Sequence, residues 1–197
     1  MNDLVPFILA VLALLAVPGP TNTLMAAVGA SRGVVKSLPF LAGELGGYFI
    51  AITFWTEVVG AVATSQPLVP VVAKFIAAAF LIWSGWKLWS AAGRADLKER
   101  GITLWRVFAT TLINPKGPVF AFAIFPQVGF VARVPYLGVF AVLVVVTAIG
   151  WMSLGMVAQK SARGLLTSAR VERVTSVALA VFAVLLVVQT VEGMLAH

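Results

Sequence analysis

Apolar residues fill long blocks of this chain, and short polar breaks separate the blocks. Each block is near or above the roughly 20 residues that a helix needs to cross a ~30 Å hydrocarbon core. The pattern predicts six membrane-spanning helices, over residues of about 4–30, 38–63, 67–91, 105–131, 134–158 and 173–194. Hydrophobic residues make up 61% of the chain, charged residues 11%, and the mean hydropathy is +1.03. Because a soluble domain carries far more charge, we expect an all-α membrane protein.

The basic residues are unevenly placed between the predicted spans. The net charge is +7, and 11 of the 14 lysines and arginines fall on one side of the membrane. These eleven are Arg32, Lys36, Lys87, Arg94, Lys98, Arg100, Arg106, Lys160, Arg163, Arg170 and Arg173. Lys74 and Arg133 fall toward the other side. Loops rich in Lys and Arg stay cytoplasmic, so we expect both termini outside the cytoplasm and no nucleic-acid partner.

The chain lacks the residues that several kinds of chemistry require. The chain has no cysteine, which excludes thiol and disulfide chemistry, and its one histidine is the last residue, His197. Away from the span ends, the acids inside the predicted spans are Glu44 and Glu57, and Glu192 lies near the end of the last span. We therefore expect no metal site, no cofactor and no enzymatic activity.

The longest polar stretch, residues 91–106, divides the chain into units of three spans each, 1–95 and 96–197. An odd number of spans makes the second unit enter the membrane from the opposite side. The first span of each unit carries a double proline, in "VPGPTNT" (17–23) and "INPKGPVF" (113–120). The sequence thus predicts two inverted three-helix repeats with broken first and fourth helices, as in transporters that bind their substrate where such helices meet. The alternative is that these prolines only kink the helices.

The first break offers backbone groups of both signs. Pro18 and Pro20 each interrupt the helix and free carbonyl groups, those of Leu14 and Ala16 by position. A helix that restarts near Thr21 presents free N–H groups that attract an anion, whereas carbonyls at the end of the first half attract a cation. We expect a zwitterion to bind at Pro18, Gly19, Pro20, Thr21 and Asn22.

The second break adds Asn114, Pro115 and Lys116 at the same depth. Lys116 lies about ten residues, or roughly 15 Å, from either end of its span, too far for its side chain to reach water. It is predicted to face the bundle interior, as a counter-charge for a substrate carboxylate, as part of a gating ion pair, or in a purely structural role.

Glu44 lies beside a close-packing motif, Gly43-x-x-x-Gly47, that lets another helix approach. A carboxyl in such a poorly hydrated place is suited to carry a coupling proton. A permanent salt bridge with Lys116 is the alternative. Glu57 is predicted to lie near the outer surface.

The segments "PGPTNTL" (18–24), "FLIWSGWKLWSAAG" (80–93) and "INPKGPVFAFAIFPQ" (113–127) closely resemble the LysE/RhtB family of bacterial amino-acid exporters. Pro18, Gly19, Pro20, Asn114, Pro115 and Lys116 match the two motifs of that family. The resemblance implies a multi-pass carrier in the bacterial inner membrane that expels amino acids or related small metabolites. It also implies coupling to a proton gradient, with sodium as the other candidate ion, and a homodimer.

The chain departs from the family at two acidic positions. Glycine stands in "LGGY" (45–48) where an acid is usual, and "VVVTAIGWMSLG" (144–155) carries no acid. These differences favour a neutral amino acid over a cationic one. An exporter or channel for inorganic cations is the alternative function, but its path should carry more than two acids.

Overall fold

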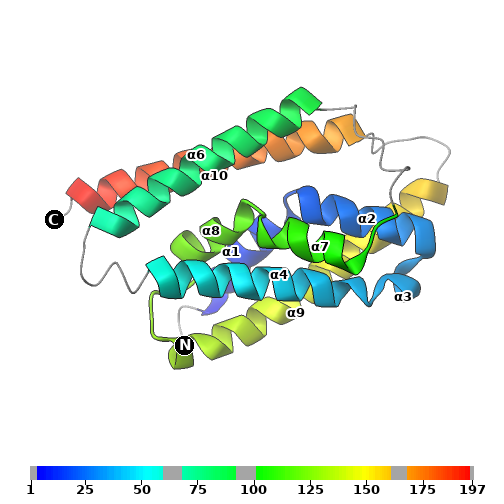
Figure 1. The fold of residues 1–197 in the computed structure, drawn as a ribbon, viewed down its shortest axis with the longest axis horizontal. Helices are drawn as coiled ribbons and strands as arrows, with labels where there is room; N and C mark the ends of the chain where they lie inside the picture. The colour runs from blue at the N-terminus through cyan, green and yellow to red at the C-terminus, as the bar shows by residue number, and fades with distance from the viewer. Residues whose placement is uncertain (1–3, 60–67, 92–100, 161–167, 196–197) are drawn as a thin grey trace.

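A computed structural model describes residues 4–59, 68–91, 101–160 and 168–195, and these residues are almost entirely helical (Figure 1). The elements are α1 (Leu4–Ala16), α2 (Pro20–Arg32), α3 (Val34–Ser37), α4 (Phe40–Thr53), η1 (Phe54–Val59), α6 (Leu68–Ala91), α7 (Leu104–Leu112), α8 (Lys116–Val119), η2 (Phe120–Ile124), α9 (Phe130–Lys160) and α10 (Ser168–Leu195). The two η elements are π-helices, which are wider than α-helices and often occur at functional sites. No strand occurs among the described residues, so the all-α prediction is confirmed for them.

Helices occupy most of each of the six predicted spans. By length and composition, two described helices are able to cross a membrane, Phe130–Gln159 and Ser176–Leu195, and up to four if each of two bent pairs is one span. Six crossings therefore stay a prediction. Arg94, Lys98, Arg100, Arg163 and both chain ends lie outside the described residues.

Both predicted helix breaks are present. α1 and α2 meet at 66° around Val17, Pro18 and Gly19, and α7 meets the α8–η2 segment at 52°. Pro20 occupies the start of α2, where its missing N–H costs no helical hydrogen bond. The physical cause is local, because proline removes a donor and its ring crowds the preceding turn.

The three most extensive helix interfaces pair α6 with α10, α2 with α9, and α4 with α7. Each of them joins a helix from residues 1–95 to a helix from residues 96–197. Figure 1 shows the α6–α10 pair along one side of the remaining helices. Beyond their mutual contact, α6 touches mainly α8 and η1. The α6–α10 pair is therefore more loosely attached than the other helices are to one another.

Glycines bring the other two helix pairs close together. A Cβ on Gly29 would lie 2.2 Å from the Met152 carbonyl oxygen, and one on Gly155 would lie 1.9 Å from that of Ala26. No larger residue fits at either position without moving α2 from α9, because the obstacle is backbone.

The predicted close approach at Gly43 and Gly47 is confirmed. A Cβ on Gly43 would lie 2.8 Å from the Leu104 carbonyl oxygen, and one on Gly47 would lie 2.7 Å from the Cβ of Thr111. These contacts press α4 against α7 beside the second break. Because Glu44 lies between the two glycines, these contacts also position Glu44 relative to α7.

Candidate functional site

Asn22 closes the end of α1 at the first break. Its amide nitrogen donates to the carbonyl oxygens of Leu15 and Val17, each at 2.8 Å. Asn22 thus turns back from the first turn of α2 onto the last carbonyls before the break. With both amide hydrogens used, the Asn22 side chain offers a solute its oxygen alone.

Asn114 joins the second break to the first. Its amide nitrogen donates to the Thr21 hydroxyl at 2.9 Å, and its oxygen accepts from the Lys116 backbone N–H at 3.0 Å. The Thr21 and Thr111 hydroxyl oxygens lie 3.1 Å apart, and Thr111 donates to the Val107 carbonyl at 2.8 Å. With the Thr111 proton so used, the consistent order runs from Asn114 to Thr21 to Thr111 to Val107. This buried chain holds α2 against α7 and α8.

Lys116 crosses from the second break to the first. Its Nζ donates to the Val17 carbonyl at 2.5 Å, and the side chain is 1% exposed, as its depth in the span predicted. The approach needs Gly19, because a Cβ there would lie 3.2 Å from Cε and 3.3 Å from Nζ of Lys116. The predicted residues of the two breaks therefore form one cluster, with the ammonium of one half on the backbone of the other.

Glu44 is buried near this cluster and is 2% exposed. It interacts electrostatically with Lys116 but forms no ion pair with it, so the permanent salt bridge is not the arrangement here. Glu44 Oε2 and the Tyr48 hydroxyl, one helical turn further on, make no hydrogen bond to a described residue. Burying a polar atom without a partner is costly, and such atoms in membrane helices mark functional positions.

The cluster offers groups of both signs within a small volume. No side chain caps the N-terminus of α2, so the N–H groups of its first turn face the break near the Lys116 ammonium. These groups favour an anion. The Glu44 carboxyl and the α1 carbonyls favour a cation. An amino acid carries an ammonium and a carboxylate group on one carbon atom, so its two charges match the two kinds of group in the cluster.

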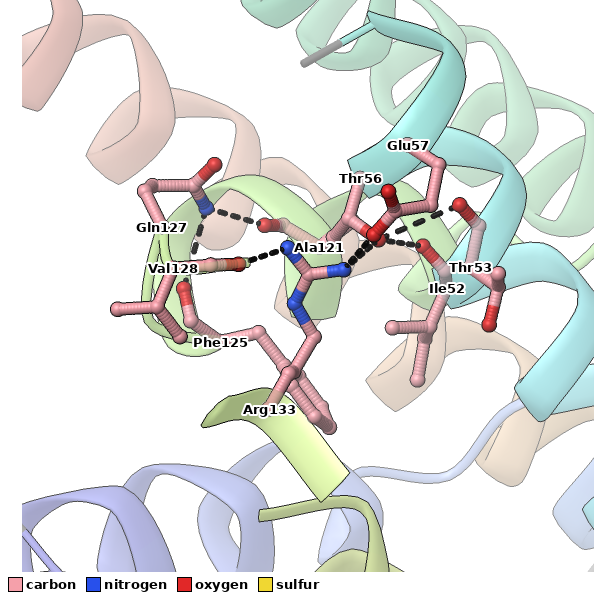
Figure 2. A network of polar contacts seen from close by, with 9 residues as sticks. All are labelled: Ile52, Thr53, Thr56, Glu57, Ala121, Phe125, Gln127, Val128 and Arg133. Atoms are coloured by element: carbon pink, nitrogen blue, oxygen red, sulfur yellow. Dashed lines mark hydrogen bonds and ion pairs between the residues drawn. The ribbon is translucent and has the colours of Figure 1, made fainter. Parts of the chain in front are cut away.

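A second polar network lies around Arg133, near the start of α9 (Figure 2). Its guanidinium donates to Thr56 Oγ1 at 2.8 Å, forms an ion pair with Glu57, and donates to the Val128 carbonyl. Arg133 is 5% exposed, whereas the Glu57 side chain is 46% exposed. The partial exposure of Glu57 agrees with its predicted place near a surface. The network links η1 to α9 and therefore the two halves of the chain.

The sequence did not single out Thr111 or Arg133. Thr111 lies three residues before Asn114, in the last turn of α7, and this polar residue close to the second break is a signal that could have found it. Arg133 was counted only as a topological charge. Its pairing with Glu57 depends on how α4 and α9 pack, which no local pattern records.

Comparison with known proteins identifies relatives. Residues 12–190 match the sequence profile of the LysE type translocator family. The chain is 31% identical over 138 residues to the homoserine/homoserine lactone efflux protein of Salmonella typhimurium strain LT2, across 66% of this chain and 65% of that protein. The homoserine/homoserine lactone efflux protein of Salmonella typhi is 30% identical, with the same coverage. The match thus spans just under two thirds of each relative's length, and no solved structure is similar.

Proposed function

The chain belongs to the LysE type translocator family, and from this we propose that it is a secondary active exporter of amino acids or similar small zwitterionic metabolites. The family consists of transporters rather than enzymes, and the chain is a multi-pass membrane protein. The observation that carries the proposal is the contact of Lys116 with the Val17 carbonyl, because it brings both helix breaks into one charged cluster.

In the proposed binding mode, Lys116 and the first N–H groups of α2 hold the substrate carboxylate. The ammonium group lies toward Glu44 and the carbonyl oxygens at the end of α1. Pro18, Gly19, Pro20 and Pro115 keep the backbone open, while Thr21, Asn22 and Asn114 orient the two halves. Substrate must displace Lys116 from Val17 or share it, so binding alters the contact between the halves.

Alternating access follows from an inverted repeat of units 1–95 and 96–197. Three features support this repeat. The first and fourth predicted spans are both broken. Exchanging the halves converts the contact of the first span (α1 and α2) with α9 into that of the fourth span (α7 and α8) with α4, and the α6–α10 interface maps onto itself. The two halves would then rearrange around the central site to open it to one side and then the other.

Coupling to the proton gradient is assigned to Glu44, the buried carboxyl without an ion-pair partner among the described residues. A proton on Glu44 would change its interaction with Lys116 and thereby the strength of substrate binding. The proposed setting is the bacterial inner membrane, as a homodimer, with both termini on the periplasmic side, consistent with the placement of basic residues.

The test uses purified protein in liposomes. Homoserine is loaded first, because two relatives are named for its efflux, and the common amino acids follow, each with and without an imposed pH or sodium gradient. Saturable efflux that responds to a pH gradient supports the proposal. Efflux of inorganic cations with none of any amino acid, from protein shown to be folded, would replace it with the alternative function.

A further inference from the structure

Two cavities lie along α6, outside the polar cluster. The Trp55 cavity has a volume of about 540 Å³ and is bounded by Phe54, Trp55, Ile76, Phe80, Ile113 and Asn114, among others. The Trp83 cavity has a volume of about 590 Å³ and is bounded by Pro20, Phe80, Trp83, Ser84, Ile113 and Asn114, among others. Both volumes lie within the roughly 300–1,000 Å³ that is usual for small-molecule sites.

The two cavities extend in opposite directions from the helix breaks. The Trp55 cavity extends toward η1 and the start of α6, whereas the Trp83 cavity extends toward the end of α6 at Lys87. They meet at Phe80, Ile113 and Asn114, which line both and are called here the junction. Ile113 is 72% exposed although it stands in the second break, at mid-depth in the fourth predicted span.

The junction borders the proposed binding site, although Lys116 and Glu44 line neither cavity. Asn114, whose amide donates to Thr21, lines both cavities, and Pro20 and Pro115 line the Trp83 cavity. A solute bound at the breaks thus has a cavity toward each end of α6. The wall that α6 provides belongs to the loosely attached α6–α10 pair, and a displacement of this pair would leave the glycine-packed interfaces in place.

The walls indicate the chemical class of the solute. Among the described lining residues of both cavities, Lys87 is the only ionisable one, and its Nζ lies 5.1 Å from the centre of the Trp83 ring. A charged side chain would find no carboxylate there to compensate its loss of water. The remaining walls are mostly apolar and suit an uncharged side chain.

We propose that the solute crosses the protein along α6 through these two cavities, and that Phe80 and Ile113 close the path between them beside Asn114. The solute is a small zwitterion with an uncharged side chain. The inference rests on the proposed function for the direction and the substrate, but the path itself can be tested without either.

Because the chain contains no cysteine, single thiols report on the path directly. Ser84→Cys places a thiol in the Trp83 cavity and Ile76→Cys places one in the Trp55 cavity. Val142→Cys, on α9, is the matched control, since Val142 is 62% exposed and lines neither cavity. The probe is a charged, membrane-impermeant methanethiosulfonate added to oriented membrane vesicles.

We expect Ser84→Cys to react from the cytoplasmic face and Ile76→Cys from the opposite face. Both should react at least about tenfold faster than Val142→Cys, because the thiolate is the reacting form and hydrocarbon disfavours it. Equal, slow labelling of all three would overturn the path, and would indicate lipid or a second copy of the chain against α6. Labelling of both cavity thiols without efflux of any amino acid would keep the path and remove only the proposed substrate.

The junction is tested by changing the size of its side chains. Ile113→Trp should abolish efflux while leaving the labelling of Ser84→Cys and Ile76→Cys in place, because it fills the junction and not the cavities. Phe80→Ala should shift preference toward bulkier uncharged amino acids. Normal efflux and unchanged preference in both folded variants would overturn the assignment of the junction.

Discussion

Lys116 and Arg133 are two buried cations that differ in what surrounds them. Each reaches from the second half of the chain to the first, Lys116 to the Val17 carbonyl and Arg133 to Thr56 and Glu57. Arg133 has a carboxylate partner, whereas Lys116 has only a backbone acceptor, although the Glu44 carboxyl is nearby. Lys116 therefore keeps the capacity to bind a further anion, whereas the charge of Arg133 is already paired with Glu57, although its buried Nε has no hydrogen-bond partner among the described residues.

This difference in partners distinguishes a substrate-binding role for Lys116 from a structural role for Arg133. A guanidinium with several fixed acceptors is held in one geometry, because its donors are planar and rigidly arranged. An ammonium on a flexible stem with one backbone acceptor exchanges partners at small cost. The comparison predicts that changes at Lys116 alter transport and changes at the Arg133 network alter stability.

The largest effect is expected for Lys116→Ala. Loss of one partner in a buried charged contact costs about 3 kcal/mol, so efflux from proteoliposomes should fall about 100-fold. Arg133→Gln is the matched variant at the other cation and should lower the rate at most about fivefold, the effect of roughly 1 kcal/mol. Equal losses of efflux rate in the two folded variants would contradict the distinction between a substrate-binding Lys116 and a structural Arg133.

Glu44→Gln is expected to leave efflux independent of pH across the neutral range. The carboxamide keeps the shape of the side chain but cannot exchange a proton, so the imposed pH gradient should no longer drive export. Efflux measured at a series of pH values checks this. Glu57→Gln should keep the wild-type pH profile, and an unchanged profile in Glu44→Gln would reassign Glu44 to packing.

Gly19→Ala should weaken transport by displacing Lys116. The added methyl group would lie 3.2 Å from Cε and 3.3 Å from Nζ of Lys116, so the end of this side chain has to shift and its contact with the Val17 carbonyl weakens. A cost of roughly 1 kcal/mol would lower the efflux rate about fivefold. Gly138→Ala is the control, since a Cβ there meets nothing within 4 Å. Identical rates for the two variants would show that the contact of Lys116 with Val17 is dispensable.

The smallest effect is expected for Glu57→Gln. Because Glu57 is 46% exposed, its ion pair resembles a surface pair and contributes about 0.5–1 kcal/mol to the free energy of unfolding. Thermal unfolding in detergent measures the loss, with Glu192→Gln as an exposed control. A loss several times larger would place the Arg133 network among the main determinants of the fold.

Much of the fold was predictable because its causes are local. Proline breaks helices through its own ring and missing donor, so Pro18, Pro20 and Pro115 marked both breaks. Gly43 and Gly47 indicated a tight helix contact through spacing alone, and α7 fills it. The position of Lys116 in its span predicted its burial, because the length of the side chain limits its reach.

The parts that escaped prediction depend on which helices pack together. The sequence could not show that Asn22 turns back onto Leu15 and Val17, or that Thr21 meets Thr111 across the two halves. The cavities along α6 likewise exist because the α6–α10 pair contacts the other helices only sparsely. Such contacts join residues far apart in the sequence, where neither hydrophobic period nor residue spacing carries information.

The Arg133–Glu57 ion pair has an energetic consequence for the proposed cycle. In a perfectly symmetric inverted repeat, exchanging the halves converts the inward-open state into the outward-open one, and the two are degenerate. Among the residues that the structure describes, this ion pair has no counterpart at the other end, and an ion pair that forms in one of the two states alone lifts that degeneracy. A bias of about 1 kcal/mol makes one resting state roughly fivefold more populated than the other. The asymmetry of two side chains would then decide the membrane face on which the unloaded carrier waits.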